Sequence, residues 1–397
     1  MSGAGDEGSL RIGSAWRLSV LYAALFLFSG IKIPFLPVWL DWRGLTAAEI
    51  AVISAAPLFA RIPVAPAVAY IADRLGNHRG VLIALAWGAF VLLLALVWGH
   101  GFWMILLLTL LISVASTSIM PLTETVAMRE VKSKGLDYGR MRLWGSLSFI
   151  AASFAGGVAI GYLGPELAVG LLAMGGLATV AGAHLLPVAA PSPLPRSGSS
   201  ARAGIRDMAT LLSSRSFLLF LAATGCVQAA HAVFYTFGTV HWRAQGLSAG
   251  WSGSLWSIGV IAEIGLFAFS GAAVRALGPI LLIAAGALAG VLRWTVMAFD
   301  PPLAALIGLQ ALHGLTFGAA HLGAVHYIAA TVPQHLAGTA QALYASVTSG
   351  IAMGAATLLA GELYASVAGG AYLAMSAMSL VGLAAVLLLL RERAASR

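Results

Sequence analysis

Charged residues are scarce in this chain. Only 9% of its 397 residues are Asp, Glu, Lys or Arg, whereas 60% are hydrophobic and the mean hydropathy is +0.93. A soluble globular domain carries about 25% charged residues, so this composition cannot cover a surface that faces water. In a bilayer the apolar side chains face hydrocarbon, and helices satisfy the backbone hydrogen bonds internally. The composition excludes an ordinary soluble enzyme and predicts a membrane protein.

Cysteine and several ligand-binding motifs are also lacking. Cys226 is the only cysteine, so the chain cannot form an internal disulfide or a Cys/His zinc cluster. The sequence has no GxxxxGK[ST] phosphate loop, which disfavours an ATP-driven pump, and no HExxH zinc motif. A membrane-embedded enzyme or a sensor remains a remote alternative. We expect no cofactor and no metal.

Long apolar segments recur along the whole chain. A membrane-spanning helix needs about 20 mostly apolar residues. Runs such as 81–97 and 372–390 are continuous, whereas the strands of a membrane barrel alternate apolar and polar residues. The sequence therefore predicts an all-α membrane protein of about twelve transmembrane helices, which begin near Arg17, Glu49, Gly80, Phe102, Arg142, Glu166, Phe217, Gly250, Pro279, Pro302, Leu336 and Gly370.

One long polar stretch divides these helices into two groups of six. It covers residues 190–215, is rich in Pro, Ser and Arg, and is typical of a flexible linker. We predict an N-terminal half at 1–189, a cytoplasmic linker at 190–215 and a C-terminal half at 216–397. The segments 69–76 and 271–278 have similar spacing after the second span of each half, as expected of a transporter built from repeats.

Basic residues predict the orientation. With both termini in the cytoplasm, most of the 22 Lys and Arg residues lie on the cytoplasmic side, and only Arg43 and Arg243 lie outside. This topology accounts for the net charge of +8 without a nucleic-acid partner. We expect a multi-pass protein of a bacterial inner membrane. Because a bundle of two halves is self-contained, we expect a monomer.

The loop after the second span carries a family resemblance. The segment Asp73-Arg74-Leu75-Gly76-Asn77-His78-Arg79 resembles the Gly-x-x-x-Asp-Arg-x-Gly-Arg-Arg motif of the major facilitator superfamily, with Ala69 in place of the first Gly. In that family the Asp and Arg residues make charge contacts that hold one gate state. The resemblance implies a conformational gate role for Asp73, Arg74 and Arg79. The alternative is a solvated turn with cytoplasmic positive charge.

Further motifs narrow the resemblance to one branch. Residues 121–124 (PLTE) and 137–145 (DYGRMRLWG) look like the region of helices four and five in the lactose permease and phenylpropionate permease branch. Other matches lie at 34–40, 262–264, 293–294, 312–317 and 341–344, so the resemblance covers essentially the whole chain. It implies the major facilitator fold and transport of a small solute driven by a proton gradient.

Ionisable residues inside the spans are candidates for function, because each costs roughly 2.5 to 3.5 kcal/mol at the bilayer centre. Lys32 and Arg61 lie deep in the first and second spans. Two cations in one half favour an anionic ligand, whose carboxylate Arg61 could bind through two parallel hydrogen bonds. Alternatively, Lys32 extends to the outer surface.

The branch resemblance assigns roles to five more residues. It places Glu263 at the solute and proton interface, with Arg293 as its electrostatic partner and His313 as a relay. A static ion pair that fixes helix packing is the alternative. Thr316 stands where lactose permease has its proton-releasing carboxylate, so Glu263 or Glu124 would have to carry the proton. Glu124 and Arg142 correspond to sugar-binding residues, although near the membrane surface such a pair can also form a gate.

His231 is the remaining candidate for substrate binding, because it lies in the seventh span one helical turn from Gln228. Together these residues predict a secondary active transporter. The leading hypothesis is proton symport of a small organic acid, with an aromatic acid such as phenylpropionate as the example that the resemblance implies. The alternative is a neutral sugar or nucleoside, which would need the Glu and Arg residues but not the cations Lys32 and Arg61.

Overall fold

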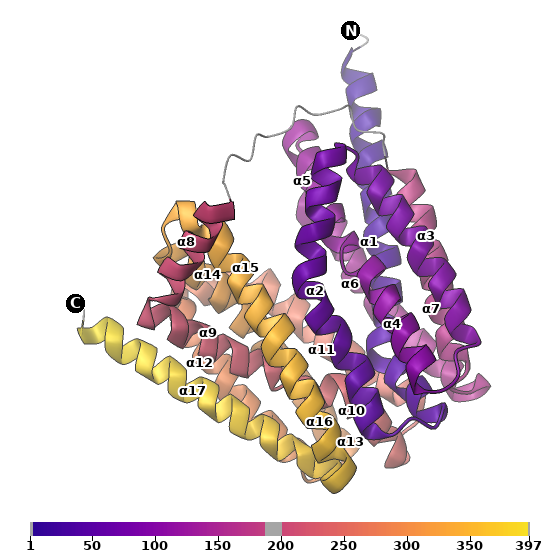
Figure 1. Ribbon diagram of the computed structural model, residues 1–397, viewed down its shortest axis with the longest axis vertical. Helices are drawn as coiled ribbons and strands as arrows, with labels where there is room; N and C mark the ends of the chain where they lie inside the picture. Colours follow the sequence, from indigo (N-terminus) through magenta and orange to yellow (C-terminus); the bar gives the residue numbers. More distant parts are fainter. Residues whose placement is uncertain (1–2, 187–200, 396–397) are drawn as a thin grey trace. The chain divides into compact units, whose positions relative to one another are not determined.

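The structure, a computed structural model, describes residues 3–186 and 201–395 (Figure 1). These ranges are helical and contain no strand. The prediction of an all-α protein is confirmed. Of the predicted linker, residues up to 200 lie outside the described ranges, and residues 201–212 form helix α8.

Seven helices precede the linker. They are α1 (Gly3–Trp42), α2 (Ala47–Leu75), α3 (His78–Val97), α4 (Phe102–Ser116), α5 (Ile119–Lys134), α6 (Tyr138–Leu163) and α7 (Leu167–Leu185). Helices α4 and α5 are separated only by the turn at Thr117 and Ser118, so they form one span, Phe102–Lys134.

The helices after the linker are more often interrupted. They are α8 (Ala201–Leu212), α9 (Arg215–Ala229), α10 (Ala232–Ala244), α11 (Ala249–Ala268), α12 (Ser270–Met297), α13 (Leu303–Ala311), η1 (Gly314–Ala319), α14 (Ala320–Thr331), η2 (Gln334–Leu336), α15 (Ala337–Ala345), η3 (Ser346–Ala352), α16 (Met353–Val367), η4 (Ala368–Ala371) and α17 (Tyr372–Ala395). The segments η1 and η3 are π-helices, which are rare and often occur at functional sites.

The number of spans agrees with the sequence. Among the described residues, eleven helical segments are long and apolar enough to cross a membrane. The last, Gln334–Ala394, has 61 residues, about three times the length that a bilayer core needs. Ala368, with φ +46°, and the short 3₁₀ segment η4 break it. The other ten segments and these two pieces make twelve spans, and the chain is a multi-pass membrane protein.

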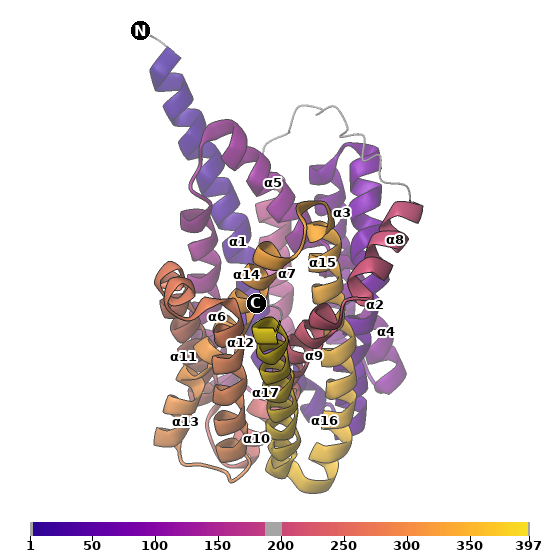
Figure 2. The same cartoon turned by 90° about the vertical axis from the view of Figure 1, so that its left-hand side faces the viewer.

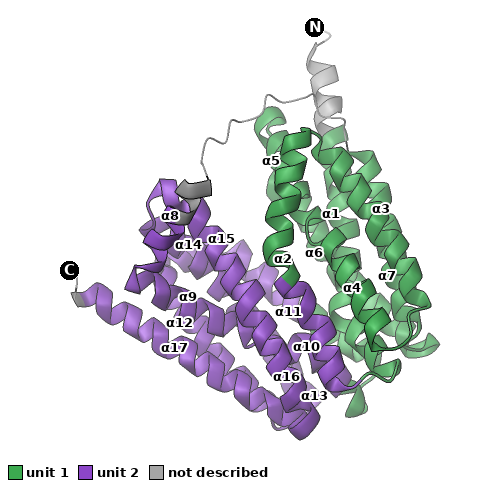
Figure 3. Ribbon diagram, viewed as in Figure 1, with its two compact units in different colours: residues 1–45, 60–195, 242–257 green, residues 46–59, 196–241, 258–397 purple. Residues whose placement is uncertain are grey.

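The described helices cluster into two compact units (Figure 3). Unit 1 consists of residues 1–45, 60–195 and 242–257, and unit 2 of residues 46–59, 196–241 and 258–397. Each unit is therefore made mainly of one sequence half, with a short segment of the other. The predicted domain boundaries stay a prediction.

In unit 1, helices α1 and α6 pack closely because one residue has no side chain. A Cβ atom at Gly30 of α1 would lie 2.7 Å from the carbonyl oxygen of Phe149 on α6. The hydroxyl of Ser153, one turn further along α6, donates to the carbonyl of Gly30 at 2.9 Å. The backbones of the two helices are thus joined by a polar bond inside the core.

In unit 2, helix α17 packs against α9 and α12 (Figure 2). The core beside them is aromatic: the rings of Phe220 and Tyr327 stack at 4.5 Å between their centres. Helix α12 bends at Gly278, where φ is +71°. The sequence predicts that a span begins at the next residue, Pro279.

Candidate functional site

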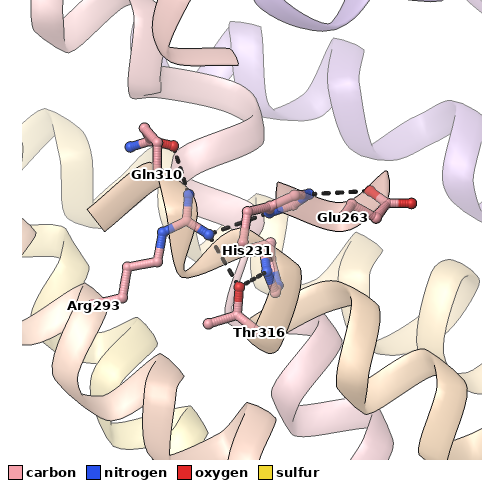
Figure 4. Close-up of polar contacts among 6 residues, drawn as sticks. His231, Glu263, Arg293, Gln310 and Thr316 are labelled. Carbon is pink, nitrogen blue, oxygen red and sulfur yellow. Dashed lines mark hydrogen bonds and ion pairs between the residues drawn. The ribbon is translucent and has the colours of Figure 1, made fainter. Parts of the chain in front are cut away.

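A fully buried arginine lies at the centre of a polar cluster in unit 2 (Figure 4). Arg293 on α12 is 0% exposed. Its Nη1 lies 3.2 Å from Nδ1 of His313 and 3.1 Å from Oγ1 of Thr316, and its Nη2 donates to Oε1 of Gln310 at 2.6 Å. No carboxylate forms an ion pair with Arg293 in the described ranges. Three neutral groups therefore stabilise this buried charge.

The π-helix η1 brings these acceptors to α12. On α12, a Cβ atom at Gly286 would lie 2.9 Å from the carbonyl of Leu315, so only glycine allows η1 to approach so closely. Arg293 follows Gly286 by two helical turns, and it reaches His313 and Thr316, which lie on either side of Leu315. The wider turn of a π-helix shifts the side chains that follow relative to an α-helix, and Thr316 lies inside that turn.

Glu263 joins the cluster through a histidine. Its Oε2 lies 3.8 Å from Nε2 of His313, the nitrogen opposite the one that contacts Arg293. The sequence predicts that Glu263 and Arg293 pair directly, and the structure instead places the imidazole of His313 between the two charges. The three residues are brought together, with His313 as the bridge.

Aromatic rings line the guanidinium of Arg293. Its Cζ lies 4.8 Å from the ring centre of Phe234 and 4.5 Å from that of Trp294, distances typical of a cation–π contact. Trp294 in turn stacks on Tyr372, with 5.9 Å between ring centres. The cation is held by ring faces as well as by hydrogen bonds.

His231 lies at the break between α9 and α10, where two residues leave the helix. Its side chain is fully buried, and Nε2 lies 3.1 Å from Oγ1 of Thr316. His231 is thus part of the Arg293 cluster, and its predicted contact with substrate stays a prediction. Gln310 is a further residue of this site that the ionisable groups of the spans do not reveal. Its signal in the sequence is an amide three residues before His313 in an apolar span.

Unit 1 has a looser charge pair. Nε of Arg142 on α6 lies 4.0 Å from Oε1 of Glu124 on α5, and both side chains are about one-third exposed, at 31% and 32%. The guanidinium rests on the ring of Phe26, 4.0 Å from its centre. Tyr22 and Tyr138, in edge-to-face contact, also interact with Glu124. Both side chains of this pair therefore remain partly accessible.

Lys32 is a cation of unit 1 that lies deep in a span. It precedes Trp42, the end of α1, by ten residues, or about 15 Å of helix. Its Nζ lies 5.8 Å from the ring centre of Phe28 and makes no hydrogen bond or ion pair with any described residue. Arg61 on α2 is exposed and likewise makes none in the described ranges.

Two of the three residues predicted to form a gate, Asp73 and Arg79, have partners within unit 1. Oδ1 of Asp73 lies 2.9 Å from Nε2 of His78, and Arg74 is exposed. Arg79 donates from Nε to the carbonyl of Leu186 at 2.7 Å and from Nη2 to that of His184 at 2.8 Å. These carbonyls end α7 and have no helical partner, so Arg79 caps this helix.

Metal-ligating side chains do not gather in the described ranges: no group of three or more His, Cys, Asp or Glu could hold an ion. The polar clusters supply hydrogen-bond donors, acceptors and charges of both signs.

Comparison with known proteins agrees with this architecture. The model of the MFS_1 like family matches residues 15–374. Over 369 residues the chain is 33% identical to a probable 3-phenylpropionic acid transporter of Escherichia coli (strain K12), with 91% of this chain and 94% of that protein aligned. It is 30% identical to a maltose permease of Geobacillus stearothermophilus, with 96% and 97% aligned.

A solved structure shows the same fold. The crystal structure of the nucleoside transporter NupG superposes with a TM-score of 0.85 at 16% identity and covers 94% of this chain and 99% of that chain. The predicted major facilitator fold is thereby confirmed.

Proposed function

This chain belongs to the MFS_1 like family of major facilitator transporters, and from that premise we propose that it is a proton-coupled symporter of a small aromatic carboxylic acid, such as phenylpropionate. It is a transporter and not an enzyme. We place it in a bacterial inner membrane, as a monomer with both termini in the cytoplasm and the proton gradient as its only energy source.

One observation carries the substrate class: among the described residues, no carboxylate forms an ion pair with the ammonium of Lys32. A charge in a span costs roughly 2.5 to 3.5 kcal/mol, and the described residues offer it only the Phe28 ring. A carboxylate ligand would neutralise the ammonium, and its aromatic ring would stack on neighbouring rings. The relation to the probable 3-phenylpropionic acid transporter supports this choice.

Proton coupling is assigned to Glu263 and His313. Glu263 is the carboxylate of the cluster around Arg293, and Thr316 stands where the resemblance expects the proton-releasing group. A proton on Glu263 would remove the negative charge that faces His313 at 3.8 Å. The charge balance around Arg293 would then change with each transport cycle.

A neutral sugar is the second candidate. The relation to a maltose permease and the Glu124–Arg142 pair, whose carboxylate and guanidinium could bind sugar hydroxyls, favour it. A sugar has no negative charge to place beside Lys32, so this residue separates the two hypotheses.

Counterflow in proteoliposomes tests the proposal. Radiolabelled 3-phenylpropionate should exchange in the wild type and in Lys32→Arg, which keeps the charge, and its KM should rise about tenfold or more in Lys32→Gln. Uncharged 3-phenylpropionamide should not compete. In a separate measurement of net uptake, the internal pH should fall when an inward gradient of 3-phenylpropionate is imposed. Arg61→Gln, a change at an exposed cation, tests whether Arg61 also binds the anion. Exchange of maltose but not of 3-phenylpropionate would overturn the proposal.

A further inference from the structure

Hydrogen-bond direction fixes the protonation of His313. A guanidinium can only donate, so Nη1 of Arg293, 3.2 Å from Nδ1 of His313, meets a lone pair on that nitrogen. The ring proton of a neutral His313 is then on Nε2. This nitrogen faces the carboxylate of Glu263.

The same reasoning gives His231 the opposite form. Its Nδ1 lies 3.1 Å from the carbonyl oxygen of Gln228, which can only accept, so Nδ1 carries the proton. Nε2 then has the lone pair and accepts from the hydroxyl of Thr316 at 3.1 Å. The oxygen of Thr316 accepts from Arg293. Donation therefore runs in one direction, from Arg293 through Thr316 and His231 to the backbone of Gln228.

We infer that His231 is a positioning residue, which acts on Arg293 through the hydroxyl of Thr316. It works as a neutral imidazole in the tautomer opposite to that of His313. Each hydrogen bond in such a chain polarises the next, so an acceptor at His231 strengthens the hold of Thr316 on the guanidinium. Arg293 is thereby kept against His313, and the imidazole of His313 presents its N–H to Glu263.

A purely packing role is the competing explanation. The ring of His231 contacts Trp294 edge to face at 5.1 Å and stacks on Tyr235 at 5.4 Å. An aromatic ring without an acceptor would preserve most of these contacts, whereas a glutamine would preserve the donor and the acceptor but not the ring. His231→Phe and His231→Gln therefore separate the two roles.

Tautomers can be observed without any substrate. We would record ¹⁵N solid-state NMR spectra of the full chain, labelled at histidine, in phosphatidylcholine bilayers at neutral pH. The signals lost in His231→Gln should belong to a neutral ring protonated on Nδ1, and those lost in His313→Gln to one protonated on Nε2. Thr316→Val should shift the Nε2 signal of His231, and Thr316→Ser should leave it in place. The same tautomer at both rings, or a doubly protonated His231, would overturn the inference.

Transport gives the second test, which rests on the proposed function. In counterflow of 3-phenylpropionate, Thr316→Val and His231→Phe should each lower the maximal rate about tenfold with little change in KM. His231→Gln and Thr316→Ser should stay near wild type, and the double variant should be no slower than either single one. A wild-type rate in His231→Phe would contradict the inference. If the wild type does not exchange 3-phenylpropionate, the proposed function fails, and the NMR result still decides the role of His231.

Discussion

The two units hold one arginine each in opposite ways. Arg293 in unit 2 is fully buried and bonded to three neutral groups, with its nearest carboxylate behind an imidazole. Arg142 in unit 1 is about one-third exposed and faces Glu124 at 4.0 Å. The arginine of unit 2 is therefore preorganised by fixed hydrogen bonds, whereas the arginine of unit 1 stays accessible in a loose ion pair.

Replacement of Arg293 should have the largest effect. In Arg293→Lys the charge remains, but one ammonium cannot reach the acceptors of Gln310, His313 and Thr316 together. With two charged hydrogen bonds lost, we expect uptake to fall about 100-fold or more. Arg275→Lys, at an exposed position of α12, is the control for replacing an arginine by a lysine. Near-normal uptake in Arg293→Lys would show that unit 2 is no more preorganised than unit 1.

A fixed carboxylate beside Arg293 should have the next largest effect. Gln310→Glu places a negative charge at the 2.6 Å contact, so the guanidinium no longer depends on His313 and Thr316. We expect equal or higher thermal stability and about tenfold slower uptake. Gln334→Glu, at an exposed position, controls for the added charge. Faster uptake would mean that the neutral acceptors are not needed.

Loss of the loose pair in unit 1 should affect binding more than stability. Glu124→Gln removes the charge but keeps the shape, and partly exposed pairs contribute only about 0 to 1 kcal/mol. The melting temperature in detergent should hardly change, while the KM for the solute rises a few-fold. A large drop in melting temperature would show that this pair holds the unit together, as the cluster in unit 2 does.

The smallest effect on uptake is expected at Arg79. Arg79→Gln removes two hydrogen bonds to the end of α7, so thermal unfolding should show a loss of about 1 to 3 kcal/mol with an unchanged KM. Arg74→Gln, at an exposed neighbour, should change neither quantity. If Arg79→Gln slowed uptake without loss of stability, the gate role that the resemblance implies would be favoured over capping.

Sequence predicted the spans well because their signals are local. The apolar runs that begin near Phe102 and Glu166 correspond to α4 and α7. The predicted start at Pro279 directly follows the bend of α12 at Gly278. The π-helices η1 and η3 could not be found in this way, since one extra residue in a turn changes neither composition nor hydropathy.

For the candidate site, the sequence identified the charges but not their connections. It singled out Glu263, Arg293 and His313 because ionisable groups are rare in spans. In the sequence, Thr316 is notable only because it replaces a carboxylate. Its hydrogen bonds to Arg293 and His231 depend on how three helices approach one another. Such contacts between distant segments leave no periodic pattern in one chain.

The π-helix η1 also makes the chain sensitive to its residue count. A π turn contains one residue more than an α turn, so a deletion within Gly314–Ala319 can be absorbed by a return to the α-helix without a broken backbone. Because the longer π turn and the α turn each cover about one full rotation, the two ends of the span would keep nearly the same phase. Thr316, which lies inside the turn, would be displaced from Arg293, although no polar side chain had been replaced. The length of this segment is thus as much a determinant of the cluster as its chemistry.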